Sequence, residues 1–214
     1  MKRISFLFAL TILLSAGTAQ ADLYVRLQGI YALPTGASYS GGAGFGLAAG
    51  WDLDTRFSLE LGFRNWAMTS AGSVEGLSLG KLCVLPIEVA LKARFPLGEK
   101  LSVFGEAGVG YAIHSFTLDE GFAADWTAIG FEIVEAPDNG LSARLGAGLE
   151  FVISPKMSLD FTAGYNLLRS SGAWSITDVY SGETASGTLE SLNFDAVTFS
   201  LGLKIAVFSP EGNR

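Results

Sequence analysis

The sequence has few of the residues that build disulfide frameworks, metal centres or nucleic-acid surfaces. Its 214 residues include one cysteine, Cys83, and one histidine, His114. A single cysteine excludes an intrachain disulfide, and one histidine without a cysteine cluster does not make a zinc-type metal site. Only 16% of the residues are charged, and acids outnumber bases by 21 to 14, which argues against a nucleic-acid partner. We expect no metal and no cofactor.

Long hydrophobic runs are equally scarce, which excludes a bundle of membrane-spanning helices. The one such run, Ile4 to Ala16, follows Lys2 and Arg3 and is too short to cross about 30 Å of hydrocarbon comfortably. Ala19 and Ala21 then supply the small residues of a signal-peptidase site. The pattern predicts a signal peptide over residues 1–21 that is cleaved on export, with a single membrane anchor as the alternative.

What the chain has in abundance is glycine, 27 residues of 214, and a strict alternation of bulky apolar residues with small or polar ones. A period of two is typical of strands with two unlike faces. The connections between the predicted strands alternate between short and long, as in a meander of upright hairpins. The alternation predicts eight strands, at residues 23–31, 44–51, 56–64, 87–95, 101–114, 141–151, 157–167 and 197–207.

The difference in bulk between the two faces predicts which one points outward. An eight-stranded barrel has an interior only just wide enough for side chains, so a face of Leu, Phe, Val and Ile would overfill it. This argues against the alternative, a soluble lipocalin-like barrel. We therefore predict an all-β fold, an eight-stranded antiparallel up-and-down transmembrane β-barrel over residues 22–208, with a short tail at 209–214. Pro86 deletes a ladder hydrogen bond, so we expect a bulge there or a strand that begins at that residue.

The inward face carries seven basic and five acidic residues. Their near balance predicts cross-strand ion pairs that fill the lumen, and a gate or narrow polar path is the alternative. This candidate lumen charge network consists of Arg26, Arg56, Glu60, Arg64, Glu88, Lys92, Arg94, Glu106, Arg144, Glu150, Asp160 and Lys204.

No residue pattern indicates catalysis. A catalytic histidine needs a nearby nucleophile and carboxylate, and Ser115, next to His114 on a strand, would face the other way. We expect no catalytic residues, and a lipid A-modifying barrel enzyme remains a remote alternative. The segment from Thr117 to Asn139 carries six acids and no base. We expect either a solvated loop or a hairpin above the membrane, with Phe131 to Val134 as one strand, whose acids meet the divalent cations that bridge lipopolysaccharide.

Two segments carry a family resemblance. Leu85–Lys92 (LPIEVALK), followed by Val103–Tyr111 (VFGEAGVGY), resembles the OmpW-like pattern among the small outer-membrane β-barrel proteins, which include the OmpA-like and OmpX-like barrels. The resemblance implies a non-enzymatic barrel in the bacterial outer membrane, a narrow channel that passes small apolar compounds sideways into the bilayer. The alternative function is a sealed structural or adhesion barrel whose extracellular loops bind partners.

The resemblance also implies partners. These are outer-membrane lipid, lipopolysaccharide and the barrel-assembly machinery, and we expect a monomer. The end of the last predicted strand resembles the assembly signal that this machinery reads, a polar residue, a glycine and two apolar residues at set spacing. The matching residues are Ser200, Gly202, Ile205 and Val207.

Overall fold

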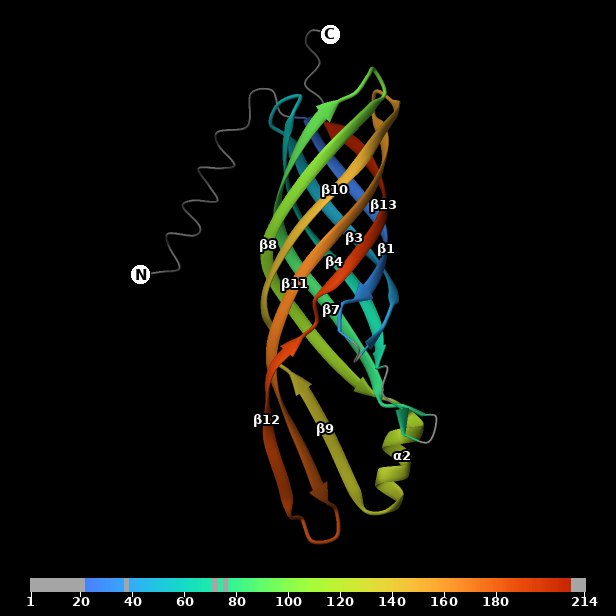
Figure 1. The fold of residues 1–214 in the computed structure, drawn as a ribbon, viewed down its shortest axis with the longest axis vertical. Helices are drawn as coiled ribbons and strands as arrows, with labels where there is room; N and C mark the ends of the chain where they lie inside the picture. The colour runs from blue at the N-terminus through green and yellow to red at the C-terminus, as the bar shows by residue number, and fades with distance from the viewer. Residues whose placement is uncertain (1–21, 37–38, 71–72, 75–76, 209–214) are drawn as a thin grey trace, which may run out of the picture.

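The computed structural model describes residues 22–36, 39–70, 73–74 and 77–208, and its main body is a closed barrel (Figure 1). The expected signal peptide at 1–21 and the tail at 209–214 lie outside the described residues. Every neighbouring pair of barrel strands is antiparallel. The eight barrel strands are β1 (Asp22–Pro34), β3 (Gly42–Asp52), β4 (Phe57–Ser70), β7 (Gly80–Pro96), β8 (Leu101–Leu118), β10 (Gly140–Ser154), β11 (Met157–Asp178) and β13 (Ala196–Phe208).

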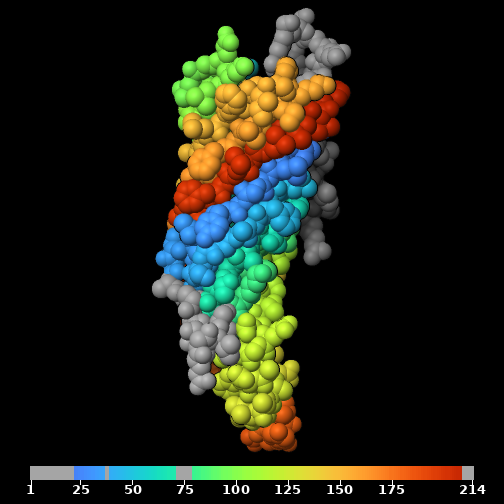
Figure 2. Space-filling view, turned by 90° about the vertical axis from the view of Figure 1, so that its right-hand side faces the viewer, coloured from blue at the N-terminus to red at the C-terminus, as the bar shows by residue number. Residues whose placement is uncertain are grey.

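The barrel closes between its first and last strands. β1 pairs with β13 from Leu23 to Pro34, and Leu27 lies opposite Leu203. In Figure 2 the blue band of β1 runs beside the red band of β13 across the surface. No strand of the barrel wall is left with an open edge, so strand pairing satisfies the backbone groups of the wall outside a short stretch beside Pro86, as a membrane barrel requires. The prediction of an eight-stranded up-and-down barrel is confirmed.

Three short connections join the hairpins at one end of the barrel, which we call the turn end. They span residues 53–56, 97–100 and 155–156. In the first, Asp54 Oδ1 accepts hydrogen bonds from the backbone N–H groups of Arg56 and Phe57, both at 2.6 Å, which is an Asx turn. The long connections lie at the opposite end, which we call the loop end (Figure 1).

Except for Arg56 in the first short turn, the alternating residues face as predicted. On the outer surface Leu145 of β10 is 66% exposed and Val109 of β8 is 67% exposed. The residues that alternate with them along the same strands point inward and are buried or nearly so. The apolar side chains therefore form the surface available to lipid tails, and the charged ones lie inside.

The loop end differs most from the predicted fold. β11 continues past the barrel to Asp178 and forms a small antiparallel sheet with β9 (Phe131–Pro137) and β12 (Thr184–Asn193). Beside β9 lies the helix α2 (Glu120–Ala128), capped by the Asp119 side chain, which accepts from the Gly121 N–H at 3.0 Å. We call α2, β9, β12 and the end of β11 the loop-end extension. The strand expected at Phe131 to Val134 is confirmed as part of β9.

The remaining elements at the loop end are short. β2 (Tyr39–Ser40) pairs with β4, and β5 (Ser73–Val74) pairs with β6 (Leu77–Ser78). No helix in the described part of the chain is long and apolar enough to cross a membrane.

Pro86 interrupts one ladder without shifting it. β7 starts at Gly80 and runs through Pro86, so the strand predicted at 87–95 is too short and Pro86 does not begin it. Phe63 of β4 pairs with Ile87, and Trp66 pairs with Val84, in the same register. The two positions between these pairs on each strand, all of them described, are unpaired across this ladder. Proline has no N–H to donate, and the ladder is interrupted at this point without a bulge. We call this interruption the gap.

Candidate functional site: a lumen in two parts

The structure places every member of the predicted lumen charge network inside the barrel except Arg56. Arg56 is exposed in the turn before β4, so that expectation is wrong. The chain is still turning at this position, because the Asp54 side chain holds the N–H groups of Arg56 and Phe57. The alternation therefore begins one residue later than the sequence indicates.

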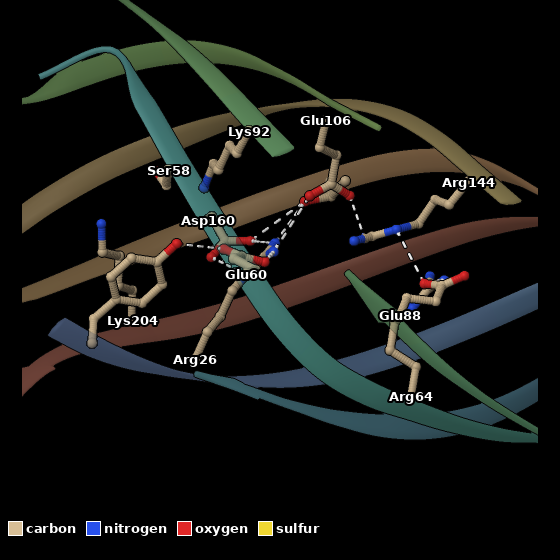
Figure 3. Close-up of polar contacts among 12 residues, drawn as sticks. Arg26, Ser58, Glu60, Arg64, Glu88, Lys92, Glu106, Arg144, Asp160 and Lys204 are labelled. Carbon is tan, nitrogen blue, oxygen red and sulfur yellow. Dashed lines mark hydrogen bonds and ion pairs between the residues drawn. The ribbon is translucent and has the colours of Figure 1, made fainter. Parts of the chain in front are cut away.

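At the centre of the network Arg26 contacts acids from three other strands (Figure 3). Its Nη1 lies 3.0 Å from Glu60 Oε2 and 3.4 Å from Glu106 Oε2, and its Nε donates to Asp160 Oδ2 at 2.9 Å. Nη2 contacts the other oxygen of Asp160 and donates to Thr162 Oγ1 at 3.0 Å. Arg26 is fully buried, so this guanidinium ties β1 to β4, β8 and β11 where water does not screen it.

A second group of charges extends from the centre toward the loop end. Arg144 Nη1 pairs with Glu106, and its Nε lies 3.6 Å from Glu88 Oε2. Arg64 Nη2 donates to the same Glu88 oxygen at 2.6 Å and to Asn166 Oδ1 at 2.7 Å. Two cations thus share one carboxylate, and the chain of contacts ends at Arg64.

A third group of charges lies toward the turn end. Lys92 Nζ donates to Glu150 Oε2 at 2.8 Å, and Lys204 Nζ donates to Asp52 Oδ2 at 2.8 Å. Arg94 pairs with Asp52 as well. Asp52 is a member that the sequence interpretation missed, because it was assigned to the turn, yet it pairs with Ser58 in the β3–β4 ladder. Other members that were missed are Tyr24, Ser58, Phe104, Thr162 and Asn166.

The network fills the lumen at its level. A cavity of about 20 Å³ remains among Gln28, Glu88 and Arg144 and neighbouring side chains, which is room for about one water molecule. Buried charges are tolerated only when they are paired and hydrogen-bonded, as these are. In this conformation the network blocks the barrel axis to solutes larger than water.

The half of the lumen beyond Arg64 is apolar. We call this group of buried side chains the loop-end cluster; it consists of Ala32, Trp66, Met68, Leu82, Val84, Ala112, Leu168, Phe194 and Ala196. Trp66 and Met68 of β4 lie directly opposite Val84 and Leu82 of β7. The Arg64 guanidinium lies 5.4 Å from the centre of the Trp66 ring, so the boundary between the two halves is a cation–π contact. The sequence interpretation had placed all of these residues except Ala112 in the long connections between strands.

His114 and Ser115 lie on opposite faces of the wall. His114 is buried, with Nδ1 2.8 Å from the Asp138 carbonyl oxygen and its ring centre 5.0 Å from that of Phe194. Ser115 is exposed on the outer surface. The two side chains are not brought together, and within the described residues no group of three or more His, Cys, Asp and Glu side chains is placed to hold a metal ion.

The four residues that match the assembly signal lie on β13. Ser200 and Gly202 are buried on the inner face, and Val207 is 62% exposed on the outer face, with Ile205 between them in exposure. The strand ends at Phe208, one residue beyond the predicted end, so an exposed aromatic residue closes it.

Comparison with known proteins agrees with this architecture. A family model described as outer membrane protein beta-barrel domain matches residues 6–205. Among solved structures, the chain is similar to outer membrane protein OprG from Pseudomonas aeruginosa, with 14% identity and a TM-score of 0.62 over 87% of this chain and 96% of that one. It is also similar to Neisserial surface protein A, with 11% identity and a TM-score of 0.54 over 87% of this chain and 98% of that one.

A third similar structure is outer membrane protein AlkL in lipid bilayers, with 12% identity and a TM-score of 0.50 over 91% of this chain and 93% of that one. At these identities the likenesses show the fold alone. No curated protein matches the chain. Because the family model covers nearly the whole sequence, the chain belongs to the outer membrane protein beta-barrel domain family, whose members lie in the bacterial outer membrane.

Proposed function

We propose that the protein is a non-enzymatic channel that passes small apolar molecules from the loop end sideways into the outer membrane. One observation carries the proposal: the β4–β7 ladder is interrupted beside Pro86, where the loop-end cluster meets the lumen charge network. A solute that enters from the loop end meets apolar side chains first and paired charges next. Breaking a buried ion pair costs about 3–5 kcal/mol, so passage straight along the barrel axis costs more free energy than a sideways exit.

The outer surface beside the gap supports a sideways exit. An apolar groove of about 540 Å³ crosses strands β1, β3, β4 and β7 there, and its lining includes Leu47, Phe63, Leu85 and Ile87. Ala48 and Gly62 line both this groove and the small cavity inside the lumen, whose lining also includes the charged Arg64 and Glu88. A solute that crosses on the loop-end side of Arg64 leaves the apolar loop-end cluster for an apolar outer surface.

The path is closed in the described conformation. Four side chains of the loop-end cluster are fully buried and lie opposite one another in the β4–β7 ladder: Trp66 opposite Val84, and Met68 opposite Leu82. Passage therefore requires side-chain rotation and a wider gap between β4 and β7. Met68 is suited to such movement, because methionine is unbranched and adapts its shape readily.

A single substitution tests the exit. Ala67 of β4 lies directly opposite Cys83 of β7, next to the interrupted stretch. Opposite residues in an antiparallel ladder have Cα atoms about 4.5–5.5 Å apart, within the range that a disulfide bridges. We expect oxidised Ala67→Cys, which fastens the gap, to lose at least about tenfold in uptake of a small apolar dye by proteoliposomes, and to regain it with a reductant.

The chain also offers a matched control. Cys83 lies opposite Ser115 on its other side, in the uninterrupted β7–β8 ladder. Oxidised Ser115→Cys fastens β7 to β8 and leaves the gap free, so its uptake should match that of the unmodified protein. Equal loss in both oxidised variants, or no loss in either, would contradict the proposed exit.

The second candidate function is a sealed barrel whose loop end binds partners. The loop-end extension and the turns that connect its elements favour it, because these turns expose apolar side chains beyond the barrel, with Tyr180 84% exposed and Ile129 64% exposed. An absence of dye uptake in every form of the protein would favour this candidate. The enzyme alternative predicts that lipid A profiles change in a strain that carries His114→Ala, and identical profiles would remove it.

The remaining parts of the proposal concern the route to the membrane and the partners. We propose export with cleavage after Ala21, insertion by the barrel-assembly machinery through Ser200, Gly202, Ile205 and Val207, and a monomer surrounded by outer-membrane lipid and lipopolysaccharide. The exposed apolar wall and the aromatic end of β13 at Phe208 support this route.

A further inference from the structure

Seven buried side-chain atoms have no hydrogen-bond partner among the described residues, and two of them are aromatic-ring nitrogens in the apolar half of the lumen. These two nitrogens are Nε1 of Trp66 and Nε2 of His114. Trp66 is fully buried and His114 is 6% exposed. Buried tryptophan N–H groups and histidine ring nitrogens are normally satisfied, because an unmade hydrogen bond costs the full desolvation of the group. An orphaned pair of ring nitrogens at one apolar cluster points to a ligand that binds when the cluster opens.

The strand register brings the two rings to the same level. Trp66 of β4 lies opposite Val84 of β7, and Val84 lies opposite His114 of β8. All three are buried inward-facing residues, and the backbones of Trp66 and His114 lie on either side of one valine. Two strand spacings place the backbones of Trp66 and His114 about 10 Å apart, a distance that their two side chains and one small group between them can span.

Hydrogen bonding sets the chemical character of each atom. A carbonyl oxygen only accepts, so the 2.8 Å contact with the Asp138 carbonyl makes Nδ1 of His114 the donor. In the neutral imidazole, Nε2 is then the acceptor. The indole Nε1 of Trp66 is a donor only. The loop-end cluster and His114 thus offer one donor and one acceptor among apolar side chains such as Leu82 and Phe194.

We propose that the loop-end cluster binds small apolar molecules that carry a single hydroxyl group, such as simple phenols and aliphatic alcohols. The hydroxyl donates its proton to Nε2 of His114, and its oxygen accepts from Nε1 of Trp66, while the hydrocarbon part packs against the cluster. A hydroxyl satisfies both atoms, whereas an ether, ester or hydrocarbon satisfies one or neither. This inference rests on the proposed function and names the solutes that the channel selects.

The single histidine makes the contact observable. With ¹⁵N-labelled histidine, the full-length protein in lipid nanodiscs gives the imidazole signals of one residue, His114. The probes are p-cresol and p-xylene, which differ by a hydroxyl in place of a methyl group. We expect p-cresol to shift the Nε2 signal in a saturable way and p-xylene to leave it in place. A p-cresol titration that leaves the signal unmoved would overturn the inference.

Variants separate hydrogen bonding from packing. Trp66→Phe and His114→Phe keep an aromatic ring and remove one polar atom each. We expect each to weaken p-cresol binding about tenfold, as the loss of one buried hydrogen bond implies, and to leave p-xylene binding unchanged. Equal weakening of both probes would mean that the residues act only through packing and would contradict the assignment.

Transport of the same two probes distinguishes the two proposals. If both probes cross the gap at equal rates and bind equally, the channel stands and the hydroxyl selection fails. If p-cresol binds selectively but neither probe is taken up, the binding site stands and the proposed channel fails.

Discussion

The two halves of the lumen are built on the same alternating strands but are stabilised in opposite ways. Toward the turn end, one buried guanidinium, that of Arg26, meets three carboxylates from three strands. Toward the loop end, Trp66, Met68 and Leu82 pack without a charge among them. The charged half gains its stability from pairing, so removing a single charge leaves others unpaired. The apolar half gains its stability from the apolar area that its side chains bury and from how well they fill the available volume. Side-chain shape therefore matters there more than the identity of the residue.

Among the substitutions that test this comparison, we expect the largest loss of stability at Arg26. Replacing it in Arg26→Met keeps much of the volume but leaves Glu60, Glu106 and Asp160 without their shared cation. We expect a loss of about 3–5 kcal/mol in the free energy of unfolding, measured by urea titration in lipid vesicles. Lys100→Met is the control, because Lys100 is exposed in the turn at 97–100 and should change stability by no more than about 0.5 kcal/mol. Similar losses in the two variants would mean that the pairing of Arg26 contributes little.

A pair of shape-preserving substitutions sharpens the contrast with a smaller effect. Glu88→Gln removes only the charge that Arg64 and Arg144 share, and we expect it to cost about 1.5–3 kcal/mol. Leu82→Met preserves the volume in the loop-end cluster and should cost less than about 1.5 kcal/mol. Both are read from the same urea titration. A larger loss for Leu82→Met than for Glu88→Gln would reverse the assignment of the two halves.

The smallest effect is expected at the turn end, outside both halves. Two backbone N–H groups donate to the exposed Asp54 carboxylate and lower its pKa below the ordinary value. A lowered pKa in the folded state stabilises the fold above the ordinary pKa, and that stability is lost as pH falls through the lowered value. We expect the acid side of the stability profile to flatten in Asp54→Asn, which keeps the acceptor oxygen but does not titrate. An unchanged profile would contradict a role for this carboxylate in acid stability.

The sequence predicted the barrel well because lipid outside and a narrow lumen inside impose strong contrast between neighbouring residues. Charged residues such as Arg26, Glu60 and Lys92 therefore identified the inner face correctly. The prediction failed where that contrast fades. Trp66 and Met68 keep the inward phase of Arg64, but they are as apolar as the outer face, so β4 appeared to end early.

The loop-end extension and the edges of the charge network were missed for more local reasons. The helix α2 buries none of its residues, so no apolar stripe marks it, and the cap at Asp119 is the only signal that could have indicated its start. Asp52 and Arg56 flank one turn, and their positions relative to the lumen depend on where the Asx turn of Asp54 ends. A shift of one residue moves a side chain to the other face of the wall.

The most direct measurement records dye uptake and ionic current from the same Ala67→Cys preparation, first oxidised and then reduced. A sideways apolar path beside a sealed charge network predicts that uptake returns on reduction and that no ionic current flows in either state. Uptake that ignores the disulfide, or a steady ionic current through the reduced protein, would contradict it.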